Sequence, residues 1–117
     1  MLRNLLRVGF WFSPIEPRLP HPRTLVDPAW DGAERFAVIR HLRHGREHEV
    51  YCGSSYCRLH ETDSCTKYAS FGLGSKEFTD GTYVWPESLI HYLVVHHVKP
   101  DAAFVKHVLT QARRTRR

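Results

Sequence analysis

Apolar residues recur with helical spacing in two segments near the end of the chain. The first segment predicts a helix that begins at Pro86, with Glu87 in its first turn. Its apolar stripe consists of Leu89, Ile90, Leu93 and Val94. The Lys99-Pro100-Asp101 sequence ends this helix, because proline cannot continue the backbone hydrogen bonds. A further helix follows, and its apolar face consists of Phe104, Val105, Val108, Leu109 and Ala112.

An earlier helix is predicted between Asp27 and His44. The Asp27 carboxylate can cap free backbone amides, and Pro28 suits the first helical position because its missing N–H costs nothing there. Gly45 is a typical helix stop. One predicted apolar face consists of Trp30, Ala33, Phe36 and Ala37, and the apolar residues off that face are Val38, Ile39 and Leu42.

The N-terminal segment allows two interpretations. Alternation of Leu6, Val8, Phe10 and Phe12 with Arg7, Gly9 and Trp11 favours a strand. Residues 1–15 also contain Arg3 and Arg7 but no acidic residue before Glu16, a composition typical of an organellar transit peptide. Four prolines then predict an extended connector over residues 13–26.

Strand patterns occupy the middle of the chain. Strands are predicted over Glu47–Tyr51 and Lys67–Phe71. Residues 76–79 and 82–85 form a predicted hairpin, in which Asp80-Gly81 would supply the two positive-φ positions of a tight turn. Together these elements predict an α+β fold, a small antiparallel sheet with a hairpin packed by three helices.

Composition is consistent with one domain. The chain has 117 residues, of which 42% are hydrophobic, and this is too apolar for intrinsic disorder. We expect an extended N-terminal segment over residues 1–26, a core over 27–112 and a basic tail over 113–117. No apolar run approaches the roughly 20 residues of a membrane helix.

Charge and cysteine content suggest a partner and a compartment. The net charge of +5 favours anionic partners such as nucleic acid, anionic lipid or an acidic protein face. Part of this charge lies in the terminal arginines, which a solvated tail also explains. Three cysteines cannot all pair within one chain, which indicates a reducing, cytoplasmic environment.

The three cysteines lie within fourteen residues, with a histidine among them. A single zinc ion needs four such donors, and the predicted ligands are Cys52, Cys57, His60 and Cys65. Reduced cysteines without metal, with Cys52 packed as a small hydrophobe, are the alternative, and a disulfide is a third. A further interpretation is a catalytic thiolate, in which Cys57 is activated by His60, His91 or His96.

The other histidines give weaker evidence for a metal site. His91, His96 and His97 crowd one helix, but no pair has the i, i+4 spacing of helical metal ligands. His107 is predicted on the polar face of the last helix, in solvent.

Aromatic residues cluster around the predicted hairpin. Tyr83, Trp85 and Tyr92 could form a stacking or partner-binding surface. Alternatively, Trp85 is a structural anchor where strand meets helix, near Leu89 and Phe104.

The segment Thr79-Asp-Gly-Thr-Tyr-Val-Trp-Pro-Glu-Ser-Leu-Ile-His-Tyr92, with Gly-Ser-Ser-Tyr-Cys-Arg before it, resembles a pattern in small bacterial proteins of unassigned activity. In that pattern TDG-x-[YW]-x-WPE-x-L-x-HY recurs, and a second cysteine can follow Cys-Arg by one residue. His60 stands at that position here, which would keep a metal ligand. The resemblance covers the middle third of the chain and implies no activity.

The leading functional hypothesis is a non-enzymatic domain that binds a macromolecule, with a protein as the first candidate and one structural zinc as its cofactor. The chain lacks a glycine-rich phosphate loop and a metal-hydrolase motif. Nucleic-acid binding through a basic face is the alternative. A cysteine-dependent enzyme is the second alternative.

Overall fold

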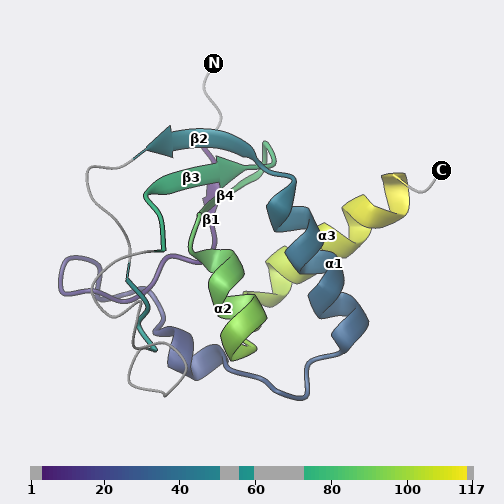
Figure 1. The fold of residues 1–117 in the computed structure, drawn as a ribbon. Helices are drawn as coiled ribbons and strands as arrows, with labels where there is room; N and C mark the ends of the chain where they lie inside the picture. Colours follow the sequence, from purple (N-terminus) through teal and green to yellow (C-terminus); the bar gives the residue numbers. More distant parts are fainter. Residues whose placement is uncertain (1–3, 51–55, 60–72, 116–117) are drawn as a thin grey trace.

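A computed structural model of the chain describes residues 4–50, 56–59 and 73–115 (Figure 1). The described elements, in chain order, are β1 (Leu6–Arg7), the 3-10 helix η1 (Pro22–Leu25), α1 (Gly32–Arg43), β2 (Arg46–Val50), β3 (Lys76–Thr79), β4 (Tyr83–Pro86), α2 (Leu89–His96) and α3 (Ala102–Thr115). The predicted α+β class is confirmed. The predicted strand over Lys67–Phe71 lies outside the described residues.

The four described strands form one sheet in the order β1-β4-β3-β2. The pairs β2–β3 and β3–β4 are antiparallel, but β1 lies parallel to β4, with Leu6 opposite Tyr83. The sheet is therefore mixed, which corrects the antiparallel prediction. In Figure 1 the helices gather below the sheet, and α1 crosses beside α3.

The N-terminal strand is shorter than its alternating pattern predicts. Gly9 adopts φ +80 and lies against Leu89, where an added Cβ would be 2.8 Å from that side chain. This turn in the backbone ends the alternation, so Trp11 is buried and Phe12 is exposed. Within the predicted connector, Pro22–Leu25 forms η1 rather than extended chain.

The predicted hairpin is confirmed, although its turn differs. Three residues, 80–82, connect β3 to β4, and only Gly81 has a positive φ. The Asp80 side chain stabilises the turn instead, because Oδ1 accepts hydrogen bonds from the Thr82 and Tyr83 amides at 2.9 and 2.8 Å.

Both of the helix starts predicted from proline are wrong. Asp27 caps only a short turn, by accepting from the Ala29 amide, and α1 begins after Asp31, which accepts from the Glu34 amide at 3.0 Å. Pro86 still pairs with the sheet, so α2 begins after Ser88. At Pro86, sheet pairing thus prevails over the helix-starting preference of proline.

The helices bury faces that differ partly from those predicted. In α1 the buried residues are Val38, Ile39 and Leu42, and Phe36 is 67% exposed. In α2 Tyr92 is buried and Val94 is not. The predicted face of α3 is confirmed in its buried residues Phe104, Val105 and Val108.

Arg35 joins α1 to the end of α2. Its guanidinium donates to the Leu93 and Val94 carbonyls at 2.9 and 2.8 Å, carbonyls that have no amide partner in the last turn of a helix. The core also includes Val8 and Trp11, so it extends beyond the predicted 27–112 range. Among the described residues, no helix is both long and apolar enough to cross a bilayer.

Candidate metal centre and basic groove

Cys57 is the one predicted zinc ligand whose position is described. Its side chain is fully buried, and it lies against the histidines of α2 rather than in an exposed loop. The other predicted ligands, Cys52, His60 and Cys65, lie outside the described residues, so the predicted four-ligand set stays a prediction.

Cys57, His91 and His96 form a compact group of metal-binding atoms. One ligand atom from each residue lies within 4.8 Å of those of the other two. Cys57 Sγ is 3.5 Å from His96 Nε2, and the two imidazole rings meet edge to face with centroids 5.2 Å apart. Bond lengths of about 2.3 Å to sulfur and 2.0–2.1 Å to nitrogen place two ligands of a tetrahedral zinc about 3.5 Å apart. The observed separation of sulfur and nitrogen matches that value.

The end of α2 explains how His91 and His96 meet despite a spacing of i, i+5. The His97 amide donates to the Tyr92 carbonyl, five residues back, so the last turn is wider than an α-helical turn. Val98 N also donates to this carbonyl, at 3.1 Å, and His97 adopts a left-handed conformation with φ 55. In this wider turn, residues that are five apart in the sequence lie closer to one face of α2 than they would in a regular α-helix. The i, i+4 criterion therefore overlooked this pair.

Backbone hydrogen bonds orient the Cys57 thiol toward α2. The Leu59 amide donates to Cys57 Sγ at 3.3 Å, a contact that stabilises negative charge on sulfur. The neighbouring Arg58 amide donates to the Tyr92 hydroxyl at 2.8 Å. Residues 56–59 are thus held against the same helix that carries both histidines.

Burial keeps both histidines in the form that binds metal. Burial and the neighbouring His96 lower the pKa of His91 to about 4, and burial also lowers the pKa of His96. Both imidazoles are therefore neutral at pH 7, with a lone pair available on one nitrogen each.

The aromatic residues that were predicted to form a binding surface are not exposed. Tyr83, Trp85 and Tyr92 are all buried, at 8% exposure or less. Trp85 is a core residue, with its ring 6.0 Å from that of Phe104, as the anchor interpretation predicted. None of the three side chains can stack on an incoming nucleobase, because the core covers their rings.

A second group of metal-binding atoms was not predicted. His41 Nε2 and His107 Nε2 lie 2.7 and 2.8 Å from the same oxygen, Asp80 Oδ2. The prediction that His107 lies in solvent is wrong, because only 16% of its side chain is exposed. These residues lie on α1, in the hairpin turn and on α3, so their sequence spacing gives no signal.

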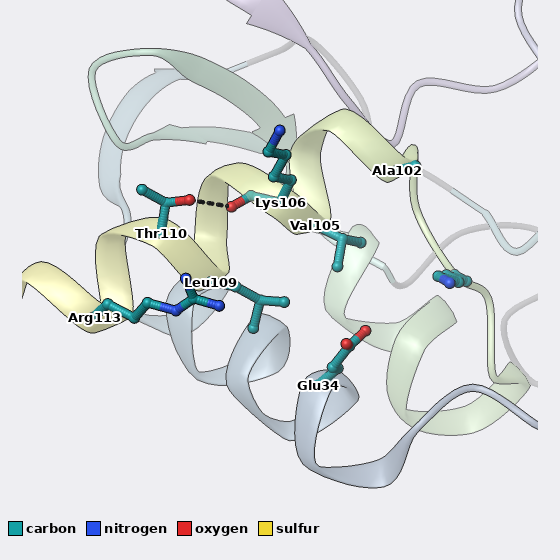
Figure 2. A pocket seen from close by; sticks show the side chains of 8 residues that line it. Glu34, Ala102, Val105, Lys106, Leu109, Thr110 and Arg113 are labelled. Carbon is teal, nitrogen blue, oxygen red and sulfur yellow. Dashed lines mark hydrogen bonds between the residues drawn. The ribbon is translucent and has the colours of Figure 1, made fainter.

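A groove of about 280 Å³ lies between α1 and α3 (Figure 2). Its lining residues are Glu34, Lys99, Ala102, Val105, Lys106, Leu109, Thr110 and Arg113. The lining thus includes three cationic residues, one carboxylate and the apolar residues Val105 and Leu109. The carboxylate of Glu34 accepts a hydrogen bond from the Trp30 indole at 3.1 Å.

Comparison of this chain with protein families, with curated proteins and with solved structures finds no match. The resemblance to small bacterial proteins therefore stays a prediction.

Proposed function

We propose that this chain is a small, non-enzymatic binding domain with one zinc ion held by Cys57, His91 and His96. The observation that supports zinc best is the 3.5 Å separation of Cys57 Sγ and His96 Nε2, with His91 completing the group. A thiolate with two neutral imidazoles is a donor set that zinc favours.

Zinc at this position would be structural. It would join the 56–59 segment to the widened end of α2, because His91 and His96 lie 34 and 39 residues after Cys57 in the sequence. Three protein ligands leave one further position of a tetrahedral ion. Cys52, His60 and Cys65 are the sequence-predicted candidates for it.

Elemental analysis of protein purified without added metal is the direct test. We expect Cys57→Ser and His96→Gln each to contain about one zinc per chain less than the native protein. His48→Gln is the matched control, because His48 lies exposed on β2 and should leave the zinc content unchanged. Full zinc content in both ligand variants would contradict the assignment.

The binding function is the second part of the proposal, and the groove between α1 and α3 favours it. Lys99, Lys106 and Arg113 give the groove a positive rim, and Val105 and Leu109 give it an apolar floor. An acidic protein segment offers both carboxylates for the rim and apolar side chains for the floor. Nucleic acid is less well suited, since the aromatic residues predicted for base stacking are buried.

Reversing the charge of the groove should weaken binding to acidic ligands. We expect Lys106→Glu with Arg113→Glu to reduce binding to an acidic peptide at least tenfold, with a smaller salt dependence. Arg18→Glu is the control, because Arg18 is exposed and does not line the groove. Tighter binding of single-stranded RNA or DNA than of acidic peptide would favour the nucleic-acid alternative.

The terminal arginines should matter for binding and not for folding. Arg113 and Arg114 are exposed at the end of α3, beyond its last buried residues. We therefore expect deletion of residues 113–117 to change the free energy of unfolding by less than ~0.5 kcal/mol, measured by denaturant titration. Binding of the acidic peptide should fall, because Arg113 is lost from the groove. A loss of several kcal/mol of stability would contradict this prediction.

The alternative function is a cysteine-dependent enzyme, and thiol labelling can test it. Cys57 and His96 are within reach of each other, but the thiol is fully buried. Buried thiols react slowly, and those bound to zinc more slowly still. Rapid labelling of Cys57 by a small electrophile in the folded, metal-loaded protein would favour catalysis.

A further inference from the structure

The group formed by His41, Asp80 and His107 connects three parts of the fold. His41 lies on α1, Asp80 lies in the turn between β3 and β4, and His107 lies on α3. Both histidines direct Nε2 at one carboxylate oxygen, at 2.7 and 2.8 Å. The group does not include any residue of the Cys57 centre.

The Asp80 carboxylate is charged and fixed in orientation. Its Oδ1 is already occupied by the Thr82 and Tyr83 amides, which leaves Oδ2 for the two imidazoles. Burial alone would raise the pKa of Asp80, but these amides and the two histidines outweigh it and lower the pKa to about 2. Hydrogen bonds behind a ligand orient it in the same way in known metal sites.

Packing also fixes the two imidazole rings. Their planes are perpendicular, with centroids 5.9 Å apart. The His41 ring lies against Trp85 and Phe104, and the His107 ring lies against Tyr83. The three side chains keep 13–19% exposure, so they are shielded from bulk water but still open to a small ion.

We propose that His41, Asp80 and His107 bind one divalent transition-metal ion. Two imidazole nitrogens and one carboxylate oxygen suit zinc, nickel, cobalt or ferrous iron, and the lack of a thiolate disfavours copper(I). Ligand atoms about 2.0–2.1 Å from one ion lie about 3.3 Å apart at the tetrahedral angle that zinc prefers and about 2.9 Å apart at the right angle of a six-coordinate ion. The nitrogen–oxygen distances of 2.7 and 2.8 Å are close to the second value, and they are also those of ordinary hydrogen bonds.

The protons balance without a further reactant. In the ion-free form each Nε2 carries the hydrogen that it donates to Asp80, because an ionised carboxylate can only accept. When the ion binds, it occupies the place of these two hydrogens. A neutral ring then carries its one proton on Nδ1, so only its tautomer changes, and a protonated ring keeps its Nδ1 proton and releases the other to solvent.

Cobalt(II) titration distinguishes this site from the Cys57 centre. Cobalt bound to a thiolate absorbs in the near ultraviolet through charge transfer, whereas cobalt bound by histidine and carboxylate does not. In the native chain we expect a second binding event without the thiolate band. His107→Gln and Asp80→Asn should weaken this event at least tenfold and leave the thiolate band unchanged, and His48→Gln should change neither.

The site would be excluded by a binding event of equal affinity in the native chain and in both variants, or by the absence of a second event. Either result would leave the three residues as a hydrogen-bonded link between helices and hairpin.

A second measurement needs no substitution, in case a variant does not fold. Zinc added to the native chain should slow chemical modification of His41 and His107, followed peptide by peptide, and unchanged rates would also overturn the proposal.

Discussion

Replacing Trp85 with alanine should leave the domain poorly folded. The side chain is fully buried, between the ring of Phe104 and the backbone at Gly45, where an added Cβ would lie 2.5 Å from the indole. Truncating a buried tryptophan costs about 3–5 kcal/mol. A small domain has a margin of only ~5–15 kcal/mol, so circular dichroism and denaturant titration should show a large loss.

Two matched variants make this prediction specific to packing. Trp85→Phe should fold with reduced stability, because it keeps an aromatic ring and removes an indole N–H that has no partner among the described residues. Phe36→Ala should change stability little, since Phe36 is mostly exposed on α1. Native stability of Trp85→Ala combined with lost partner binding would show that Trp85 acts in recognition instead.

Removing the metal should loosen the 56–59 segment and lower the melting temperature. A metal site that does not exist in the unfolded chain adds its binding energy to folding, so a strong chelator should unfold or partly unfold the protein. Hydrogen exchange should show the largest loss of protection at the Arg58 and Leu59 amides, which bond to the Tyr92 hydroxyl and Cys57 Sγ.

Returning zinc should restore the original melting temperature in the native chain, and it should raise the melting temperature of Cys57→Ser by much less. The control is His48→Gln, which should respond to chelator as the native chain does. An unchanged melting temperature in excess chelator, together with no metal by mass, would leave Cys57 as a packed thiol and refute the zinc proposal.

Local patterns predicted the elements whose neighbours in space are also neighbours in sequence. The hairpin follows from two β-rich segments around Asp80-Gly81, and its pairing requires nothing from elsewhere in the chain. The face of α3 follows from a strong helical periodicity with one buried side. Elements of this kind depend on local propensity and pattern alone.

Tertiary contacts decided the features that the sequence did not predict. Pro86 has the preference of a helix start, yet its place in the sheet opposite Glu77 delays α2 to Leu89. Helix α1 packs against α2 and α3 and buries Val38 and Leu42, whereas Phe36 stays exposed. A periodic pattern with two apolar faces does not tell which face will meet the neighbouring helices.

Of the residues in the two candidate sites, the sequence predicted only Cys57 as a metal ligand, because a cysteine among other cysteines indicates metal binding by itself. Cys57 was predicted as a ligand, but its described neighbours come from α2, 34 and 39 residues further on. His91 and His96 were set aside because the widened last turn of α2 has no sequence signature that an i, i+4 criterion detects. His41, Asp80 and His107 meet only because three separate elements pack together.

The parallel pairing of β1 with β4 also determines the order in which this chain can fold during synthesis. Tyr83, the partner of Leu6, is synthesised 77 residues after it. Closing so long a loop has a high entropic cost, and contacts of this range form late in folding. The apolar residues Val8 and Trp11 therefore stay unburied until β3, β4 and α2 have emerged. During that interval the nascent chain exposes a hydrophobic segment, the kind of segment that chaperones bind.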